Sequence, residues 1–258
     1  MNIANIKKTG LAATYKGAEI LRQYFGKLTG VMKKGAIDLV TEADLEAEKA
    51  IIEVLHSAFP EHSILAEESG LNHKNSENQW IIDPLDGTTN FAHELGIFAV
   101  SIAFSYQNEI IHGFVLNPVS GELFTAEKGQ GAMLNGKSMS VSSTEKISEA
   151  LLVTGFPYNH PEIIDTIMAR FGRCISASQG VRRLGSAALD LCYVARGRFD
   201  GFWEQNLKPW DTAAGMLIVE EAGGRVTDFS GNPYNIYQKE ILATNMNIHQ
   251  EMMNLMKY

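Results

Sequence analysis

Residues 80–93, WIIDPLDGTTNFAH, constrain the fold of this chain more than any other segment. The apolar residues 80–82 predict a buried strand, and two aspartates three positions apart, Asp83 and Asp86, follow it directly. Pro84 fixes its own φ angle and has no amide hydrogen, so we expect the chain to bend straight after Asp83. The bend can bring both carboxylates toward one centre. The segment therefore predicts a charged ligand at the end of a strand.

The residues after the bend add two further ligand groups. The carbonyl of Leu85 can turn toward the same centre as the aspartates, and Gly87 and Thr88 are expected to begin a helix. The first amides of a helix have no partner within it, and they commonly bind phosphate. Carboxylates for metal ions beside amides for a phosphate are the parts of a metal-assisted phosphate ester hydrolase.

Other acids stand at the ends of other predicted elements: Asp44 in VTEAD, Glu67 and Glu68 in AEES, and Asp211 in PWDTAAG. Carboxylates gathered at strand ends repel one another unless a cation lies among them. Oxygen donors with few His or Cys favour Mg²⁺ over zinc. Taken alone, Asp44 could complete a capping box with Thr41, and Asp211 could cap a helix. The conjunction of these motifs favours the metal site.

Hydrophobic periodicity predicts an α+β front part, residues 1–147, and an α/β back part, residues 148–258, within one compact unit. In the front part we expect helices over 4–25 and from 41 to near 60, strands over 63–66 and 80–83, and an antiparallel meander over 100–139 with turns at 107–108, 118–121 and 135–136. In the back part we expect strands over 151–153, 200–203, 225–228 and 241–243 and helices over 161–172, 186–196, 212–222 and 246–257.

Composition restricts the partners. The 22 basic and 30 acidic residues give a formal charge of −8, which argues against a broad nucleic-acid footprint. The most apolar stretch, residues 96–106, is too short to span a membrane, and charged residues interrupt the N-terminal apolar pattern. The two cysteines lack metal-site spacing. We therefore expect a cytoplasmic protein whose partner is a small molecule.

At these motifs the sequence resembles the inositol monophosphatase family of Mg²⁺-dependent, lithium-sensitive sugar phosphatases. WIIDPLDGTTNFAH resembles the first signature of that family and WDTAAGMLIVEEAGG the second. DLVTEAD, AEES and GSAALDLCYVARGRFDGFWE match in the expected order, so the likeness covers nearly the whole chain. The resemblance implies a five-layer αβαβα sandwich, a homodimer, and hydrolysis of a phosphate monoester such as myo-inositol monophosphate.

The resemblance also implies two metal sites. Glu67, Asp83 and the Leu85 carbonyl would bind the first Mg²⁺. Asp83, Asp86 and Asp211 would bind the second, so that Asp83 would bridge both ions.

The other implied roles concern the water and the ester. Thr88, hydrogen-bonded to Asp44, would orient the attacking water together with Glu67, and the amides of Gly87 and Thr88 would hold the phosphate. The residues expected at the substrate are Asp86, Gly185, Ser186, Ala187 and Glu204. Lys33, five residues before Asp38, matches a loop near the metals.

The substrate stays open at this point. Superfamily relatives hydrolyse fructose 1,6-bisphosphate, histidinol phosphate or nucleotide bisphosphates, and DGTTNF favours inositol monophosphate among these. Arg182 and Arg183 could bind a second phosphate, which keeps fructose 1,6-bisphosphate as the alternative, or they could be solvated or contact a second subunit. A hypothesis of another class is a regulator that binds a sugar phosphate and metal without turnover.

Overall fold

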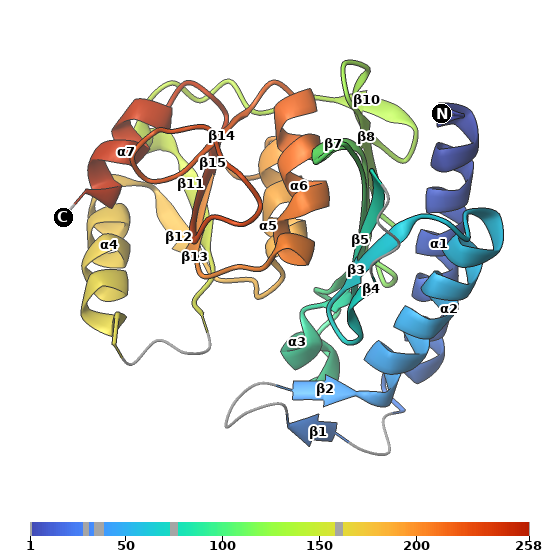
Figure 1. The fold of residues 1–258 in the computed structure, drawn as a ribbon. Helices are drawn as coiled ribbons and strands as arrows, with labels where there is room; N and C mark the ends of the chain where they lie inside the picture. The colour runs from blue at the N-terminus through green and yellow to red at the C-terminus, as the bar shows by residue number, and fades with distance from the viewer. Residues whose placement is uncertain (1, 28–30, 34–38, 73–76, 158–161, 258) are drawn as a thin grey trace.

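The computed structural model describes residues 2–27, 31–33, 39–72, 77–157 and 162–257. Two sheets alternate with three pairs of helices (Figure 1). The helices are α1 (Ile3–Tyr24), α2 (Glu42–Ala58), α3 (Thr88–Ala92), η1 (Ile147–Glu149), α4 (Ile164–Ala177), α5 (Ala187–Ala195), α6 (Pro209–Glu221) and α7 (His249–Met256). The order of layers, α1 and α2, sheet, α5 and α6, sheet, α4 and α7, confirms the predicted αβαβα sandwich.

The larger sheet has eight strands and contains the predicted meander. Its spatial order is β10 (Lys137–Met139), β9 (Gly131–Leu134), β8 (Leu123–Glu127), β7 (Glu109–Leu116), β6 (Ala99–Tyr106), β5 (Asn78–Asp86), β3 (Ser63–Ala66) and β4 (Gly70–Asn72). The strands from β5 to β10 pair antiparallel with their sequence neighbours, whereas β3 runs parallel to β5. The tight turn between β6 and β7 places Gln107 and Asn108 at φ angles of 50° and 65°, which asparagine tolerates well.

The smaller sheet has five strands and mixes the two strand directions. Its order is β12 (Gly180–Arg182), β11 (Leu151–Thr154), β13 (Gly201–Gln205), β15 (Glu240–Thr244) and β14 (Arg225–Thr227). β11 runs parallel to both neighbours, and the other pairs are antiparallel. Sequence analysis missed the edge strand β12, because three residues are too short to show a strand periodicity. It also missed β4 and the hairpin of β1 (Val31–Lys33) and β2 (Leu39–Thr41).

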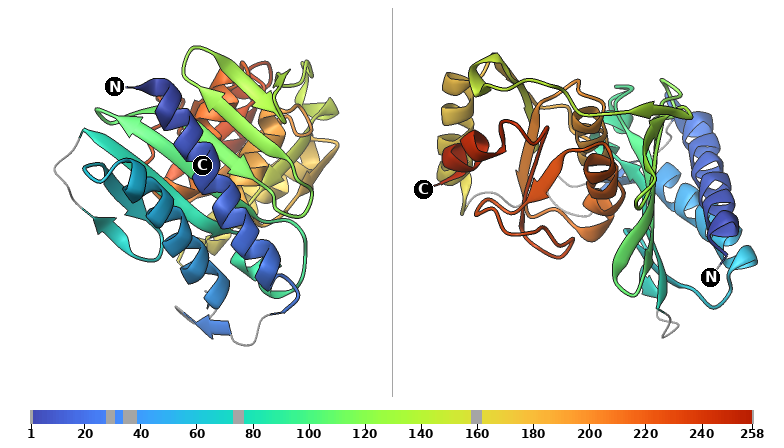
Figure 2. Two further views of the ribbon diagram at one scale, coloured as in Figure 1. Left: turned by 90° about the vertical axis from the view of Figure 1, so that its right-hand side faces the viewer. Right: turned by 90° about the horizontal axis from the view of Figure 1, so that it is seen from above.

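The outer helix α1 packs flat on the larger sheet (Figure 2). Gly10 makes the close approach to the sheet possible, because a Cβ atom there would lie 2.4 Å from Phe114 Cε2 of β7. Gly17 does the same for the approach of α1 to α2, where a Cβ atom would lie 2.7 Å from Ile51 Cδ1. The buried face of α1 follows the helical repeat and comprises Ile6, Thr9, Gly10, Ala13, Thr14, Gly17, Ala18 and Leu21.

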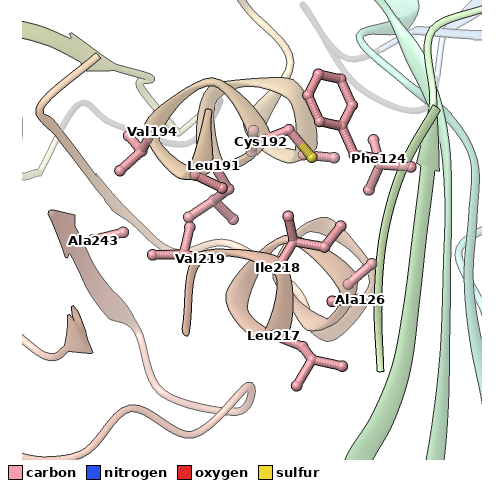
Figure 3. Packing of buried hydrophobic residues seen from close by; sticks show 14 of the residues in the cluster. Phe124, Ala126, Leu191, Cys192, Val194, Leu217, Ile218, Val219 and Ala243 are labelled. Atoms are coloured by element: carbon pink, nitrogen blue, oxygen red, sulfur yellow. The ribbon is translucent and has the colours of Figure 1, made fainter. Parts of the chain in front are cut away.

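The helices α5 and α6 form the middle layer and contact both sheets (Figure 3). Leu191 and Ile218 share one apolar cluster with Phe124 of the larger sheet and Ala243 of the smaller one. Gly215 lets the two helices approach, since a Cβ atom there would lie 2.6 Å from Leu191 Cδ1. This shared core fixes the two sheets relative to each other, and with them the strand ends that carry the acids.

Two element boundaries differ from the prediction for reasons that bear on the site. β5 does not end at Asp83 but continues through Pro84 to Asp86, with an irregular register between Asp83 and Asp86. The Leu85 amide donates to Asp83 Oδ1 at 2.9 Å, so the irregularity keeps its buried amide paired. α6 begins at Pro209, three residues earlier than predicted, because proline suits the first turn of a helix.

None of the described helices is both long enough and apolar enough to cross a bilayer.

Candidate active site

Asp83 is the most enclosed acid at the end of β5. Its residue is 1% exposed, and burial raises the pKa of its carboxyl well above the usual range. The charges of Glu67, Asp86 and Asp211 raise this pKa further, in that order. The four predicted metal-binding acids therefore lie close enough to repel one another, although they come from three separate parts of the sequence.

Asp86 is held by the N-terminus of α5. Its carboxylate accepts hydrogen bonds from Ser186 Oγ at 2.5 Å, from the Ala188 amide at 2.8 Å and from the Ala187 amide at 3.3 Å. Burial raises the pKa of Asp86 to about 6, against these hydrogen bonds and the charge of Arg183, which lower it. The GSA segment, expected at the sugar, thus also positions a predicted metal ligand.

Asp211 is not the N-cap residue of α6, as one of the two alternatives from the sequence had it, because the helix begins two residues earlier, at Pro209. It occupies the third position of α6, where its carboxylate accepts the Lys208 amide at 2.7 Å as in a capping box. Burial and the charge of Asp86 raise its pKa well above the usual range. The capping bond occupies Oδ2 and therefore fixes the direction of the side chain toward the other acids.

Asp44 likewise caps a helix and reaches the site. Its Oδ2 accepts the Thr41 amide at 2.8 Å and the Thr41 hydroxyl at 2.5 Å, which completes the capping box of α2. Its Oδ1 accepts Thr88 Oγ1 at 3.1 Å. Burial raises the pKa of Asp44 to about 6, while the bonds from Thr41 lower it.

Thr88 has two acceptors for one hydroxyl proton. Its Oγ1 lies 3.1 Å from Asp44 Oδ1 and also 3.1 Å from the Leu85 carbonyl oxygen. A hydroxyl that donates to the carboxylate keeps its lone pairs for a third partner. Thr88 Oγ1 could therefore accept a hydrogen bond from a water molecule and fix its orientation.

Gly87 joins β5 to α3 in a conformation that only glycine adopts easily. Its φ is +100°, and a Cβ atom there would lie 3.0 Å from the Ile97 carbonyl oxygen and 3.2 Å from that of Gly185. Asn90 ties the same segments together, because its Nδ2 donates to the carbonyls of Ile97 at 2.7 Å and Leu184 at 2.8 Å. Asn90 was not singled out from the sequence, where it is one more polar residue of the DGTTNF signature.

Glu204, at the far side of the cluster, is a buried acid on β13. It is 7% exposed, and burial together with the charge of Asp211 raises its pKa to about 8, while Arg183 lowers it. A Cβ atom at Gly155 would lie 2.1 Å from Glu204 Oε2, so only glycine leaves room for this side chain.

Asp190 is a second buried acid nearby that sequence analysis missed. Among the described residues its Oδ1 has no hydrogen-bond partner, and burial and the charges of Glu204 and Asp86 raise its pKa well above the usual range. The signal available in the sequence was a single acid within the apolar helix AALDLCYVA.

A cleft of about 1250 Å³ opens above the acids. The described residues that line it are Glu67, Glu204, Asp211 and Asp228 together with residues of the segments 156–157, 162–163, 205–210 and 236–240. Asp83 and Asp86 are not among these lining residues. The cleft is large enough to hold a sugar-sized ester.

The structure does not describe the side chains of two residues expected in the loop near the metals, Lys33 and Asp38. Asp38 lies outside the described residues, and Lys33 ends β1, where only its backbone is described. Their proximity to the metals stays a prediction.

The chemistry of the donor set fits a hard divalent cation. Every candidate ligand offers oxygen, and the charges of Glu67 and Asp86 raise the pKa values of both Asp83 and Asp211, so positive charge among these acids would relieve the repulsion. In the described part of the chain, however, no three acidic, His or Cys side chains already converge on one point with metal-ligand spacing. In this structure the Ala188 amide donates to Asp86 and the Lys208 amide donates to Asp211.

Comparison with known proteins places nearly the whole chain in one family. The family described as "Inositol monophosphatase family" matches residues 2–256. The chain belongs to this family. The inositol-1-monophosphatase of Synechocystis sp. is 48% identical over 238 residues, covering 92% of this chain and 83% of the relative. The Nus factor SuhB of Pseudomonas aeruginosa is 46% identical over 220 residues, covering 83% and 81%.

A solved structure shows the same fold. The inositol monophosphatase from Anabaena (Nostoc) sp. superposes with a TM-score of 0.90 at 41% identity and covers 99% of this chain and 96% of its own. Membership of the inositol monophosphatase family makes this protein a phosphatase that acts on phosphate monoesters. The prediction of an enzyme is thereby confirmed.

Proposed function

We propose that this inositol monophosphatase family member hydrolyses myo-inositol monophosphate to inositol and phosphate with Mg²⁺ as cofactor. The observation that carries the proposal is the cluster of Glu67, Asp83, Asp86 and Asp211 beside the Thr88–Asp44 hydrogen bond. In this cluster the charges of Glu67 and Asp86 raise the pKa values of Asp83 and Asp211. Such a cluster is unfavourable unless a cation is bound, and the hydrogen-bonded pair suits the orientation of a water molecule.

We propose the same metal ligands that the family resemblance implied. Glu67, Asp83 and the Leu85 carbonyl would hold one Mg²⁺, and Asp83, Asp86 and Asp211 the second. When bound, the cations would supply positive charge for the phosphoryl oxygens and for activation of the attacking water.

The remaining residues act on the water and the ester. Thr88 donates a hydrogen bond to Asp44 and orients the water together with Glu67, while the amides of Gly87 and Thr88 bind the phosphate. Asp86 and Glu204 bind the hydroxyl groups of the leaving alcohol, and residues 185–187 line its pocket.

The test is release of inorganic phosphate from a panel of inositol, sugar and nucleotide phosphates, with and without Mg²⁺. We expect the highest kcat/KM on inositol monophosphate and no turnover after exhaustive chelation. Full turnover in the chelated enzyme would contradict the metal assignment.

Fructose 1,6-bisphosphate remains the second candidate substrate because of Arg183. A Cβ atom at Gly185 would lie 2.4 Å from Arg183 Nη1, so this guanidinium lies against the GSA segment. There it lowers the pKa values of Asp86 and Glu204, and it could pair with a second phosphate. A higher kcat/KM on fructose 1,6-bisphosphate than on inositol monophosphate would favour this candidate.

Three broader expectations also remain proposals: a homodimer, a cytoplasmic location and one cooperative folding unit over residues 1–258. Light scattering tests the first, fractionation of cells the second, and coincident unfolding of the front and back parts the third.

We predict that Mg²⁺ stabilises the fold more at about pH 8 than at about pH 5.5. Folding raises the pKa of Asp86 from 3.8 to about 6 and that of Glu204 from 4.5 to about 8. The metal-free folded state therefore binds more protons than the unfolded chain within these windows, and it loses stability as the pH rises through them. A cation offsets the charge that develops, so its effect should grow with pH.

Thermal unfolding with Mg²⁺, compared with NaCl of equal ionic strength, measures this difference. An equal increase in Tm at both pH values would show that the cation does not bind at these acids.

We predict that Glu204→Ala lowers kcat/KM for inositol monophosphate about ten- to a hundredfold, the effect of one or two lost hydrogen bonds to a buried carboxyl. β-Glycerophosphate presents fewer hydroxyl groups, so kcat/KM for this ester should fall much less in the same variant. Glu162→Ala removes an exposed acid from the same cleft and serves as the control. Equal losses on both esters would contradict a role of Glu204 in selecting the alcohol.

A further inference from the structure

The helix α2 contacts the active site through two acids on one face. Asp44 and Glu48 are four residues apart, so they project from the same side of the helix. Asp44 bonds to Thr88, as described above. Glu48 is 4% exposed and has no part in the proposed chemistry.

Glu48 binds two consecutive backbone amides of the AEES segment. Its Oε2 accepts the Glu68 amide at 2.8 Å, and its Oε1 accepts the Ser69 amide at 2.9 Å. These two bonds span 20 and 21 residues of sequence, from the middle of α2 to the loop between β3 and β4. Hydrogen bonds from amides to an ionised carboxylate are about twice as strong as neutral ones.

The amide before these two is also fixed. The Glu67 amide donates to the Ile82 carbonyl of β5 at 3.2 Å. Three successive amides of the AEES segment are thus fixed by two different elements, β5 on one side and Glu48 on the other. The backbone that carries the Glu67 carboxylate has little freedom left.

The chemistry of residue 48 is specific. A carboxylate presents two acceptor oxygens to the two adjacent amides. Glutamine has only one such oxygen and would turn its NH₂ group, a donor, toward one of these amide donors. Aspartate keeps the charge but is one methylene shorter.

We propose that Glu48 is a positioning residue for catalysis, which sets the place of Glu67 relative to Thr88. Through Asp44 and Glu48, one rigid helix holds both groups that orient the attacking water. A small displacement of such a group lowers the rate strongly even when the fold survives. The inference rests on the role proposed above for Glu67.

The test compares Glu48→Gln and Glu48→Asp with Glu46→Gln, an exposed acid on the same helix. We expect both Glu48 variants to lower kcat for the preferred ester about ten- to a hundredfold, with KM changed less than threefold. The Mg²⁺ concentration for half-maximal activity should rise several-fold. In the metal-free protein, hydrogen exchange at the Glu68 and Ser69 amides should become at least about tenfold faster. Glu46→Gln should change none of these quantities.

The results for the two Glu48 variants distinguish a positioning role from an effect of charge and from simple stabilisation of the loop. If Gln is impaired and Asp is not, residue 48 acts through its charge, and the positioning role is wrong. If amide exchange speeds up while kcat and Mg²⁺ dependence stay unchanged, Glu48 only stabilises the loop, which also overturns the proposal.

The result can also be distinguished from a failure of the proposed function. If the wild-type protein releases no phosphate from any ester, the proposed function fails. Calorimetric titration with Mg²⁺ alone then decides the inference. Weaker binding in both Glu48 variants supports it, and unchanged binding overturns it.

Discussion

Asp83→Asn should lower kcat by about a thousandfold, which corresponds to about 4 kcal/mol of lost transition-state stabilisation. Asp83 is the proposed bridge between the two cations, and the other three acids of the cluster all act on its pKa. Asparagine keeps an oxygen that can accept the Leu85 amide, so the backbone between Asp83 and Asp86 should persist. The loss should therefore fall on catalysis and not on folding.

The same variant should unfold at a higher temperature than the wild type in the absence of metal at about pH 8. The raised pKa of the Asp83 carboxyl lowers folding stability at pH values above its unfolded pKa, and asparagine does not titrate. Steady-state kinetics and thermal unfolding together measure both effects. Asp165→Asn makes the same change on the exposed face of α4 and is the matched control. Near-normal turnover in Asp83→Asn, with loss of activity in Glu67→Gln, would assign the bridging role to Glu67 instead.

Thr88→Ala and Asp44→Asn should each lower kcat by about a hundredfold, within the usual range for a group that assists proton transfer. In Thr88→Ala the hydroxyl is absent. In Asp44→Asn an NH₂ group can face Thr88 in place of the acceptor now 3.1 Å away, and Thr88 then donates to the Leu85 carbonyl. Either change removes the fixed orientation of the hydroxyl, so the double variant should be little worse than either single one.

Asp44 also caps α2, and Thr41→Ala separates this structural role. That variant removes the hydroxyl bond to Asp44 Oδ2 and should cost about 1 kcal/mol of stability, but it keeps the contact with Thr88. We expect its kcat to stay within about threefold of the wild type. Independent, multiplying losses in the Thr88 and Asp44 variants would show that Asp44 serves only as a helix cap.

The sequence alone determined the layers and most of the candidate ligands. The periodicity of 4–25 and the capping box at Thr41 depend on local geometry, and so do the turns at Gln107, Asn108 and Asn135, where asparagine tolerates positive φ. The acids could be predicted for a different reason. They stand in long signatures at element ends, so their types and order indicate one site before any contact is known. Their roles in that site stay predictions.

Only the tertiary structure decided which groups hold these acids in place. Asp86 takes its partner Ser186 from 100 residues away, and Glu48 binds amides 20 and 21 residues away. Neither bond has a local signature, because it forms only when the shared core of α5 and α6 fixes the two sheets and when α2 packs beside β5. The burial of Asp190 and the short edge strand β12 have the same origin. Local geometry predicts elements and their ends, whereas packing between distant elements decides burial, partners and pKa values.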